Sequence, residues 1–268
     1  MSHSMGTHVK MNSAQRQGVI LGDMKASGFV SVPMLAEQCG VSEMTVRRDL
    51  DRLAEFGLLE RMHGGAAPLR RTAIARVDLV EPSLDMRHLA QAPQKLAIAR
   101  AAARIITPGQ TIALDIGTTT GRLAAELANT AVSIYTTSVR IAASLASARP
   151  MVYLPGGLVA GAEPSIVGSR AIAHLRQLNF EIAFLGASGL SEGGILFDYS
   201  LEDAEVKRAF TEAAQRVVML LDSSKFNRVS VARICSVAQI DTLITDCMPP
   251  EPIRSLLAES NVDVIIAE

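Results

Sequence analysis

The hydrophobic side chains near the start of the chain recur at the spacing of amphipathic helices. Val46, Leu50 and Leu53 fall at positions i, i+4 and i+7, and they predict one apolar face on a helix. Gly40 and Ser42 come just before this helix. A glycine accepts the left-handed backbone that ends one helix, and a serine hydroxyl caps the next. Two short helices joined by a tight turn are therefore predicted.

The opposite side of the second helix is polar. Met44, Thr45, Arg47 and Arg48 point away from the predicted apolar face, near the helix N-terminus. A helix that presents such side chains after a tight turn is the arrangement with which helix-turn-helix proteins read the major groove of DNA. An ordinary helical hairpin with a solvated arginine pair fits the same residues, so the flanking segments decide between the two interpretations.

The flanking segments favour DNA binding. A further helix is predicted near residues 16–24, and the sequence ERMHGGA at residues 60–66 predicts a short hairpin. Helices followed by a small hairpin are typical of a winged helix-turn-helix, in which Arg61 and His63 would lie beside backbone phosphates. The predicted DNA-contacting residues are Ser42, Met44, Thr45, Arg47, Arg48, Arg52, Arg61 and His63.

Beyond residue 94 the pattern changes to apolar strands that alternate with helices. Strands are predicted near residues 111–115, 132–136, 151–155, 182–187, 217–221, 243–245 and 262–266. This alternation is typical of an α/β domain in which helices cover both faces of a mostly parallel sheet. The predicted organisation is a disordered leader at 1–11, an all-α winged helix-turn-helix DNA-binding domain at 12–67, a linker at 68–93 and an effector-sensing α/β domain at 94–268.

Glycine, hydroxyl and charged residues gather in the loops that follow the predicted strands, where ligands of such sheets bind. The loop after the first strand combines a glycine with three threonines at a helix start, the outline of a phosphate cradle. A threonine-capped helix without a ligand fits that loop equally well. Together the loops predict a site for a small anionic molecule, with Lys225 as its charge partner. The predicted effector-binding residues are Asp115, Gly117, Thr118, Thr119, Thr120, Thr137, Ser138, Gly156, Gly157 and Lys225.

Composition and charge narrow the possible functions. The net charge of −1 excludes a polybasic nucleic-acid binder, and residues 1–71 have only a small positive excess. Cys39, Cys235 and Cys247 lack metal-ligand spacing and are predicted to be buried, reduced thiols, so neither a metal nor a cofactor is expected. We find no apolar run long enough to cross a membrane and no signal-peptide core, and we therefore expect a cytoplasmic protein with no membrane partner.

The segment from RRDL at 47–50 to HGGA at 63–66 closely resembles the amino-terminal signature of the DeoR family of bacterial transcriptional regulators. The second domain resembles the same family in DIGTTT at 115–120, LPGG at 154–157, AEVKRAF at 204–210, DSSKF at 222–226 and LITD at 243–246. One departure is TTS at 136–138, where the family commonly has Thr-Asn-Ser, so an amide contact is missing.

The resemblance implies a repressor of a carbohydrate-metabolism operon. It implies a sensor domain similar in fold to ribose-5-phosphate isomerase, with a phosphorylated sugar or related metabolite as effector. The implied effector contacts come from Asp115, Gly117, Thr118, Thr119 and Lys225, while Glu205 and Lys207 either contact the effector or only brace the fold. The expected partners are a double-stranded DNA operator and the effector. Because one such head binds DNA weakly, a homodimer or homotetramer is also expected.

The alternative function is a sugar-phosphate isomerase-like enzyme fused to a DNA-binding head. Isomerisation through an enediol needs a carboxylate base close to the substrate carbon. The loop at residues 186–194 offers only Glu192 for this role, and Asp115 and Asp222 also suit structural roles in their loops. We therefore expect a regulator without catalytic residues.

Overall fold

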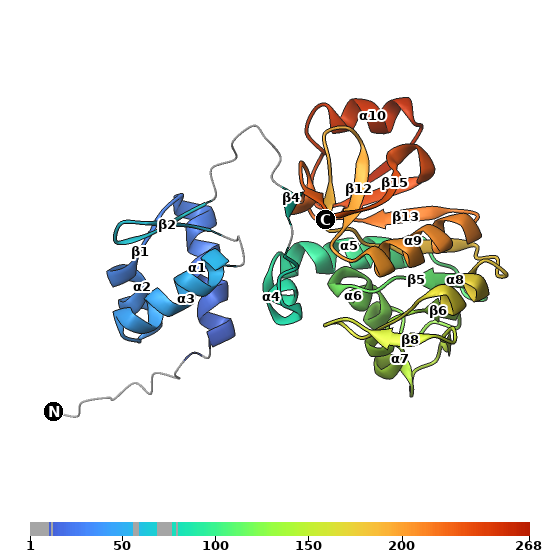
Figure 1. Cartoon of the computed structure of the whole chain (residues 1–268), viewed down its shortest axis with the longest axis horizontal. Coiled ribbons are helices and arrows are strands. Elements are labelled where there is room, and N and C mark those ends of the chain that lie inside the picture. The colour runs from blue at the N-terminus through green and yellow to red at the C-terminus, as the bar shows by residue number, and fades with distance from the viewer. Residues whose placement is uncertain (1–10, 12, 56–58, 69–76, 79) are drawn as a thin grey trace. The chain divides into compact units, whose positions relative to one another are not determined.

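The computed structural model describes residue 11 and residues 13–55, 59–68, 77–78 and 80–268. The chain divides into two compact units, residues 1–74 and 75–268, and each is described by itself (Figure 1). The predicted disordered leader lies outside the described residues except for Met11.

Three helices form the body of the first unit: α1 (Ser13–Ser27), α2 (Val32–Cys39) and α3 (Glu43–Glu55). The turn between the last two has the predicted chemistry. Gly40 ends α2 with a φ of +63°, in the left-handed region. The Ser42 hydroxyl oxygen accepts a hydrogen bond from the backbone N–H of Thr45 at 3.3 Å, which caps the start of α3.

A small antiparallel sheet completes the first unit. Strands β2 (Glu60–Met62) and β3 (Gly65–Ala67) form the predicted hairpin, and β1 (Val30–Ser31) pairs with the other edge of β3. This is the winged form of the helix-turn-helix. The core of this unit consists of buried aliphatic side chains, among them Ile20, Leu35, Val46, Leu50, Leu53, Leu59 and Ala66.

The second unit is built on a parallel sheet, as the sequence predicts. Within residues 80–268 seven strands pair in the order β17-β16-β13-β10-β5-β6-β7, and every pairing is parallel. Their bounds are β5 (Thr111–Leu114), β6 (Ser133–Thr136), β7 (Met151–Tyr153), β10 (Ile182–Leu185), β13 (Val217–Leu220), β16 (Thr242–Thr245) and β17 (Asp263–Ile266).

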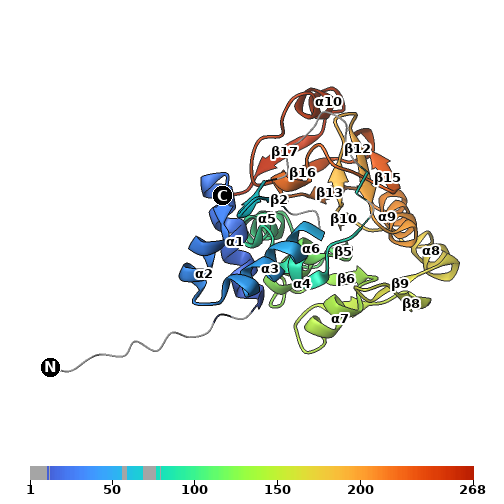
Figure 2. The same cartoon turned by 60° about the vertical axis from the view of Figure 1, so that its left-hand side comes forward.

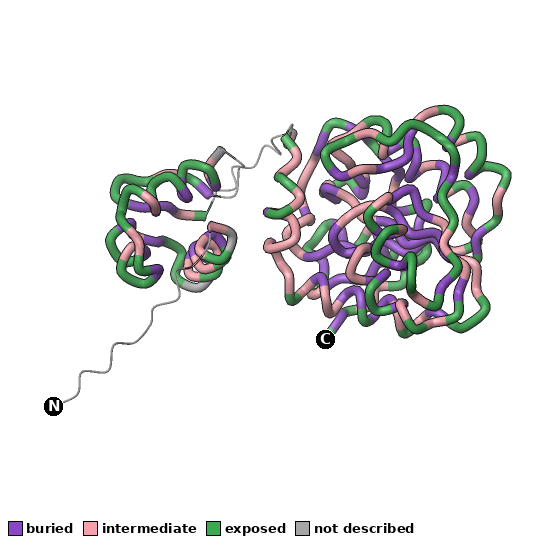
Figure 3. Tube along the Cα trace, turned by 90° about the horizontal axis from the view of Figure 1, so that it is seen from below, coloured by how far each residue is buried: buried purple, intermediate pink, exposed green. Residues whose placement is uncertain are grey.

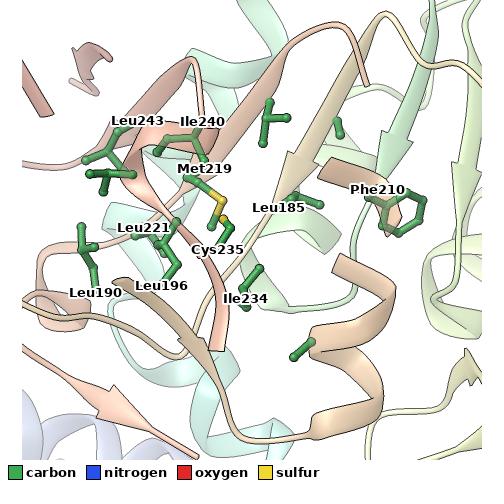
Figure 4. Close-up of a cluster of buried hydrophobic side chains, with 14 of the residues drawn as sticks. Leu185, Leu190, Leu196, Phe210, Met219, Leu221, Ile234, Cys235, Ile240 and Leu243 are labelled. Atoms are coloured by element: carbon green, nitrogen blue, oxygen red, sulfur yellow. The ribbon is translucent and has the colours of Figure 1, made fainter. Parts of the chain in front are cut away.

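Helices cover both faces of this sheet. Along β10 the side chains alternate: Ile182 and Phe184 lie in one hydrophobic core, while Ala183 and Leu185 lie in the other. The first core is completed by α5 (Ala92–Arg104), α6 (Thr118–Glu126) and α7 (Val139–Leu145). The second is completed by α8 (Ser169–Leu175), α9 (Leu201–Ala213) and α10 (Ile253–Glu259). Buried residues concentrate in the interior of the second unit (Figure 3), and Figure 4 shows part of the second core.

Several short strands were not predicted. The antiparallel hairpin β8 (Leu158–Ala160) and β9 (Ser165–Val167) lies beside α7 (Figure 2). A second antiparallel sheet consists of β11 (Gly189–Leu190), β12 (Ile195–Asp198) and β15 (Ala232–Ser236). Its residues, among them Leu196 and Ile234, share the second hydrophobic core with α9 (Figure 4).

The segment predicted as a linker, residues 68–93, contributes elements to the second unit. Strand β4 (Val77–Asp78) pairs with β14 (Val229–Ser230), and the Asp78 carboxylate forms an ion pair with Arg228 at 2.8 Å. Helix α4 (Leu84–Leu89) packs against α6. These contacts join residues far apart in sequence, so local patterns could not predict them. None of the helices among the described residues is both long enough and apolar enough to span a membrane.

Candidate functional site

The polar side of α3 is the candidate DNA-reading surface. Ser42, Met44, Arg47, Arg48 and Arg52 are exposed there, while the Thr45 side chain is half-buried. The hydroxyl groups of Thr45 and Ser42 are hydrogen-bonded at 3.0 Å. The Arg47 guanidinium forms an ion pair with Glu43 one turn earlier, at 3.0 Å. No ion pair involves Arg48 or Arg52 within the described part of the chain, so both side chains can reach a phosphate or a base edge.

Arg61 has a structural connection that the sequence did not predict. Its Nε donates to Asp51 of α3 at 2.8 Å, and its Nη1 donates to the carbonyl oxygen of Gly65 at 2.8 Å. The side chain therefore connects the recognition helix to the hairpin. His63 is exposed at the hairpin turn, as expected for a residue beside DNA.

The second unit contains a pocket beyond the carboxyl ends of the parallel strands. The predicted effector residues that line it are Gly117, Thr118, Thr119, Thr120 and Lys225. The other lining residues are Glu81, Arg87, Lys95, Ile116, Gly186, Ala187, Ser188, Asp198, Tyr199, Lys207, Leu220 and Asp222. Strands β5, β10 and β13 lead directly into the loops that form its walls.

The N-terminus of α6 opens into this pocket. Gly117 precedes the helix with a φ of +131°, and no side chain caps the helix there. Amide groups in the first turn of a helix have no partner within the helix, so they are available to bind an anion. The Gly117 amide itself donates to the Glu163 carboxylate at 3.2 Å. The Thr120 hydroxyl donates to the Gly117 carbonyl oxygen at 3.0 Å and stabilises the turn.

Two lysines bring positive charge to the same pocket. Lys95 of α5 is only 4% exposed, and its Nζ donates to the carbonyl oxygen of Arg87 at 2.6 Å. Burial lowers the pKa of Lys95 to about 8. Burial also lowers the pKa of Lys225, and the nearby Arg228 adds to this effect. Among the residues that the structure describes, neither lysine forms an ion pair with a carboxylate, so their charge is available to a ligand.

The positive charge of a third lysine is balanced by carboxylates of the protein. Lys207 of α9 is fully buried, contacts the Asp115 carboxylate and lies 3.3 Å from Asp198. Burial alone would lower the pKa of Lys207, but these carboxylates raise it, so the ammonium stays charged. Asp115 also accepts from the Gly186 amide at 3.0 Å, which ties β5 to β10 below the pocket. Asp115 and Lys207 are thus bonded to each other, and Glu205 is exposed outside the pocket.

The remaining predicted effector residues do not line the pocket. Ser138 caps α7 through a hydrogen bond from the Ile141 amide at 3.2 Å, and Thr137 is buried next to it. Gly157 packs so closely on β9 that an added Cβ would lie 2.7 Å from Ile166. Gly156 is exposed beside Arg170.

Sequence reasoning missed Arg87, Lys95 and Glu163, which surround the α6 N-terminus. For Lys95 a signal was present, because it shares the buried side of α5 with Ile98, Ala99 and Ala102. A lysine on an apolar helix face is a candidate for a functional role. Arg87 and Glu163 come from the predicted linker and an unpredicted hairpin, and nothing in their local sequence places them here.

These features define a class of protein: a winged helix-turn-helix joined to an α/β unit with a lysine-lined pocket beyond the strand ends. Two family models match the chain in the same arrangement. The DeoR-like helix-turn-helix domain matches residues 16–72, and the DeoR C terminal sensor domain matches residues 90–247. The chain belongs to the DeoR family and is a DNA-binding transcriptional regulator.

Similar proteins carry names consistent with this family. The glycerol-3-phosphate regulon repressor of Escherichia coli K12 is 31% identical over 256 residues, which cover 95% of this chain and 99% of that protein. The transcriptional repressor CsqR of the same organism is 30% identical over 243 residues, 90% of each chain. Among solved structures, ribose 5-phosphate isomerase A from Methanocaldococcus jannaschii has a TM-score of 0.40 at 20% identity, covering 51% of this chain and 55% of that one. So low a TM-score supports no argument about shared chemistry.

Proposed function

We propose that this protein represses a carbohydrate-metabolism operon and that a phosphorylated sugar or related metabolite, bound in the pocket of the second unit, changes its affinity for the operator. The names of similar proteins support this direction, since one is a glycerol-3-phosphate regulon repressor and another a putative aga operon repressor. The same proposal places the protein inside the cell, because DNA and sugar phosphates are found there.

One observation carries the choice of ligand. Lys95 and Lys225 line a pocket into which the N-terminus of α6 also opens, and neither has a carboxylate partner within the described residues. A phosphate group satisfies all of these donors at once, because it has several acceptor oxygens and a double negative charge. Tyr199, which also lines the pocket, supplies a hydroxyl group for a sugar moiety.

The proposed switch requires more than one DNA-reading head. A homodimer or homotetramer would hold two α3 helices at the half-site spacing of an operator. The effector would then favour an arrangement with a different spacing. A coupling free energy of about 1–3 kcal/mol changes DNA affinity roughly 5- to 150-fold.

The geometry favours binding without catalysis. Glu192, the carboxylate that the isomerase alternative needs, is exposed and does not line the pocket. The Asp115 carboxylate contacts Lys207, and Asp222 accepts from the Ser224 amide at 3.1 Å, where it caps the turn Ser223–Lys225. Both acids are therefore committed to hydrogen bonds that hold the loops, and we propose no catalytic base.

The function is tested by measuring ligand binding and DNA release together. Thermal-shift and calorimetric titrations with sn-glycerol 3-phosphate and with pentose and hexose phosphates should identify a stabilising ligand. That ligand should change the affinity for an operator selected from random DNA. Lys225→Ala should weaken ligand binding about tenfold or more, because a charge-assisted hydrogen bond is lost. It should leave ligand-free DNA binding unchanged.

Arg176→Ala is the matched control, since this exposed side chain of the second unit pairs with Glu212 at the surface and does not line the pocket. It should bind ligand as the wild type does. Turnover of any of these phosphates, or equal ligand binding by Lys225→Ala, would contradict the proposal.

A further inference from the structure

A carboxylate of the protein itself binds two of the donors that line the pocket. Glu163 Oε1 accepts the hydrogen bond from the Gly117 amide at 3.2 Å, and Oε2 accepts from Nη2 of Arg87 at 2.9 Å. The Glu163 residue is 6% exposed. A helix N-terminus and an arginine are the donors that an anionic ligand would use. Glu163 therefore holds the position of a ligand's anionic group.

The fold fixes Glu163 in this position through the residues that follow it. The Pro164 carbonyl oxygen accepts from the Val139 amide at 3.2 Å, and the Ile166 amide donates to Thr137 at 2.8 Å. The Ser165 hydroxyl donates to Asp203 at 2.8 Å. These bonds tie the turn between β8 and β9 to the start of α7 and to α9. They also give the buried Thr137–Ser138 loop a structural role behind the pocket.

The Glu163 carboxylate binds only some of the hydrogen-bond donors of the pocket. It neutralises Arg87, which also pairs with Glu81 at 3.1 Å, but it forms no bond with Lys95 or Lys225. A ligand whose anionic group carries one charge would replace Glu163 by an equivalent group, so its net gain in binding free energy would be small. A phosphomonoester carries two charges and three terminal oxygens, so it can replace both Glu163 bonds and also bind the lysines.

We propose that Glu163 is an internal competitor that the effector must displace from the Gly117 amide and from Arg87. The inference rests on the proposed function of the pocket. Displacement of the Glu163 carboxylate has a free-energy cost, and this cost lowers the apparent affinity for every anion by a similar factor. A phosphate dianion that also binds Lys95 and Lys225 overcomes the cost, whereas a monocarboxylate does not. At a given concentration a phosphorylated metabolite therefore occupies the pocket and a carboxylated one leaves it empty.

The test uses the full chain and three probes: inorganic phosphate, sn-glycerol 3-phosphate and D-glycerate, whose single carboxylate is the matched monoanion. Calorimetric titration at pH 7 compares wild type with Glu163→Gln, which keeps the size of the side chain and removes its charge. We expect both phosphates to bind about tenfold more tightly to Glu163→Gln. D-glycerate should gain a similar factor, because the same internal carboxylate opposes both kinds of anion.

Glu181→Gln is the control, because the Glu181 carboxylate also accepts a backbone amide, that of Thr111 at 2.7 Å, at an exposed position outside the pocket. It should bind all probes as the wild type does. If Glu163→Gln does not fold, Glu163→Asp gives the same test, since the shorter side chain cannot reach both Gly117 and Arg87. Its affinity for phosphate should rise severalfold.

A measurement on the wild-type protein makes the inference independent of any variant. With glutamate labelled at the side-chain carboxyl carbon, the Glu163 NMR resonance should move when phosphate saturates the pocket. An unmoved resonance, or unchanged affinity in Glu163→Gln, overturns the role of Glu163. In that case the proposed function still holds if phosphate binds and its binding depends on Lys225. If no phosphate binds to the wild type or to either variant, the proposed function itself fails.

Discussion

The Nε atom of Arg16 lies 2.8 Å from Oδ2 of Asp49, and this ion pair joins helix α1 to the inner side of the recognition helix. Both side chains are largely buried. Asp49 also accepts a hydrogen bond from the Ser13 hydroxyl at 3.0 Å. Although Asp49 follows two exposed arginines in the sequence, it contributes to the core of the first unit and not to its DNA-reading surface.

Replacement of Asp49 by alanine should destabilise the first unit strongly. The change leaves the Arg16 guanidinium buried without its counter-charge, and breaking a buried pair costs about 3–5 kcal/mol. Urea unfolding followed by circular dichroism measures the loss. Arg47→Ala is the control, because the exposed Arg47–Glu43 pair contributes at most about 0.5 kcal/mol. Equal stability of the two variants would contradict the structural role of Asp49.

Arg48→Ala should weaken DNA binding without unfolding the first unit. Arg48 is exposed on α3 and has no ion pair within the described residues, so its loss removes a contact to DNA and none within the protein. The expected loss of operator affinity corresponds to about 1–3 kcal/mol, measured by fluorescence anisotropy. Arg254→Ala serves as the control, since this exposed arginine of the second unit pairs only with Glu251. Unchanged affinity in Arg48→Ala would remove Arg48 from the DNA-reading surface.

Much of the fold could be predicted because its signals are local. The period of the apolar residues located α3 through Val46, Leu50 and Leu53, and the run of apolar strands located the parallel sheet. Gly40 and Ser42 were placed by turn and cap chemistry, which depends on neighbouring residues alone.

The pocket was only partly predictable because its residues come together through long-range contacts. Gly117, the threonines after it and Lys225 follow strands of one sheet, so the strand-end rule brings them together. The same rule also suggested Thr137, Ser138, Gly156 and Gly157, which do not line the pocket. Arg87 reaches the pocket from α4, and Glu163 of a short hairpin contacts Arg87 and the Gly117 amide. No local pattern indicates either set of contacts.

Gly157→Ala should destabilise the second unit, whereas Gly156→Ala should not. A Cβ on Gly157 would lie 2.7 Å from Ile166 Cγ2 and 2.9 Å from the Val167 carbonyl oxygen, which forces the β8–β9 hairpin to shift. Such overpacking costs about 1–3 kcal/mol. At Gly156 the nearest atom is Arg170 Cδ at 3.6 Å, an ordinary contact. Thermal unfolding of the two variants tests the difference. Equal stability, with ligand binding lost only in Gly157→Ala, would instead support contact between Gly157 and the effector.

The low pKa of Lys95 makes anion binding depend on pH. Burial lowers this pKa from 10.5 to about 8. The attraction of Asp222 opposes the shift, and the positive charges of Lys225, Arg122 and Arg87 contribute to it. Above pH 8 the ligand-free protein therefore holds Lys95 mostly neutral. A bound phosphate favours the charged form and raises the pKa again. Binding above pH 8 must then include uptake of a proton, so affinity is highest below pH 8 and falls as the pH rises.

Between pH 7.5 and 9 the affinity for sn-glycerol 3-phosphate should fall roughly fivefold to tenfold, as expected when one proton is taken up with the ligand. The phosphomonoester is already a dianion throughout this range, so its own titration does not contribute. Calorimetry in two buffers with different ionisation enthalpies counts the protons directly. Lys95→Met should bind more weakly at pH 7.5 and lose most of the pH dependence. If Lys95→Met keeps the full slope, the proton binds elsewhere and Lys95 does not contact the anion.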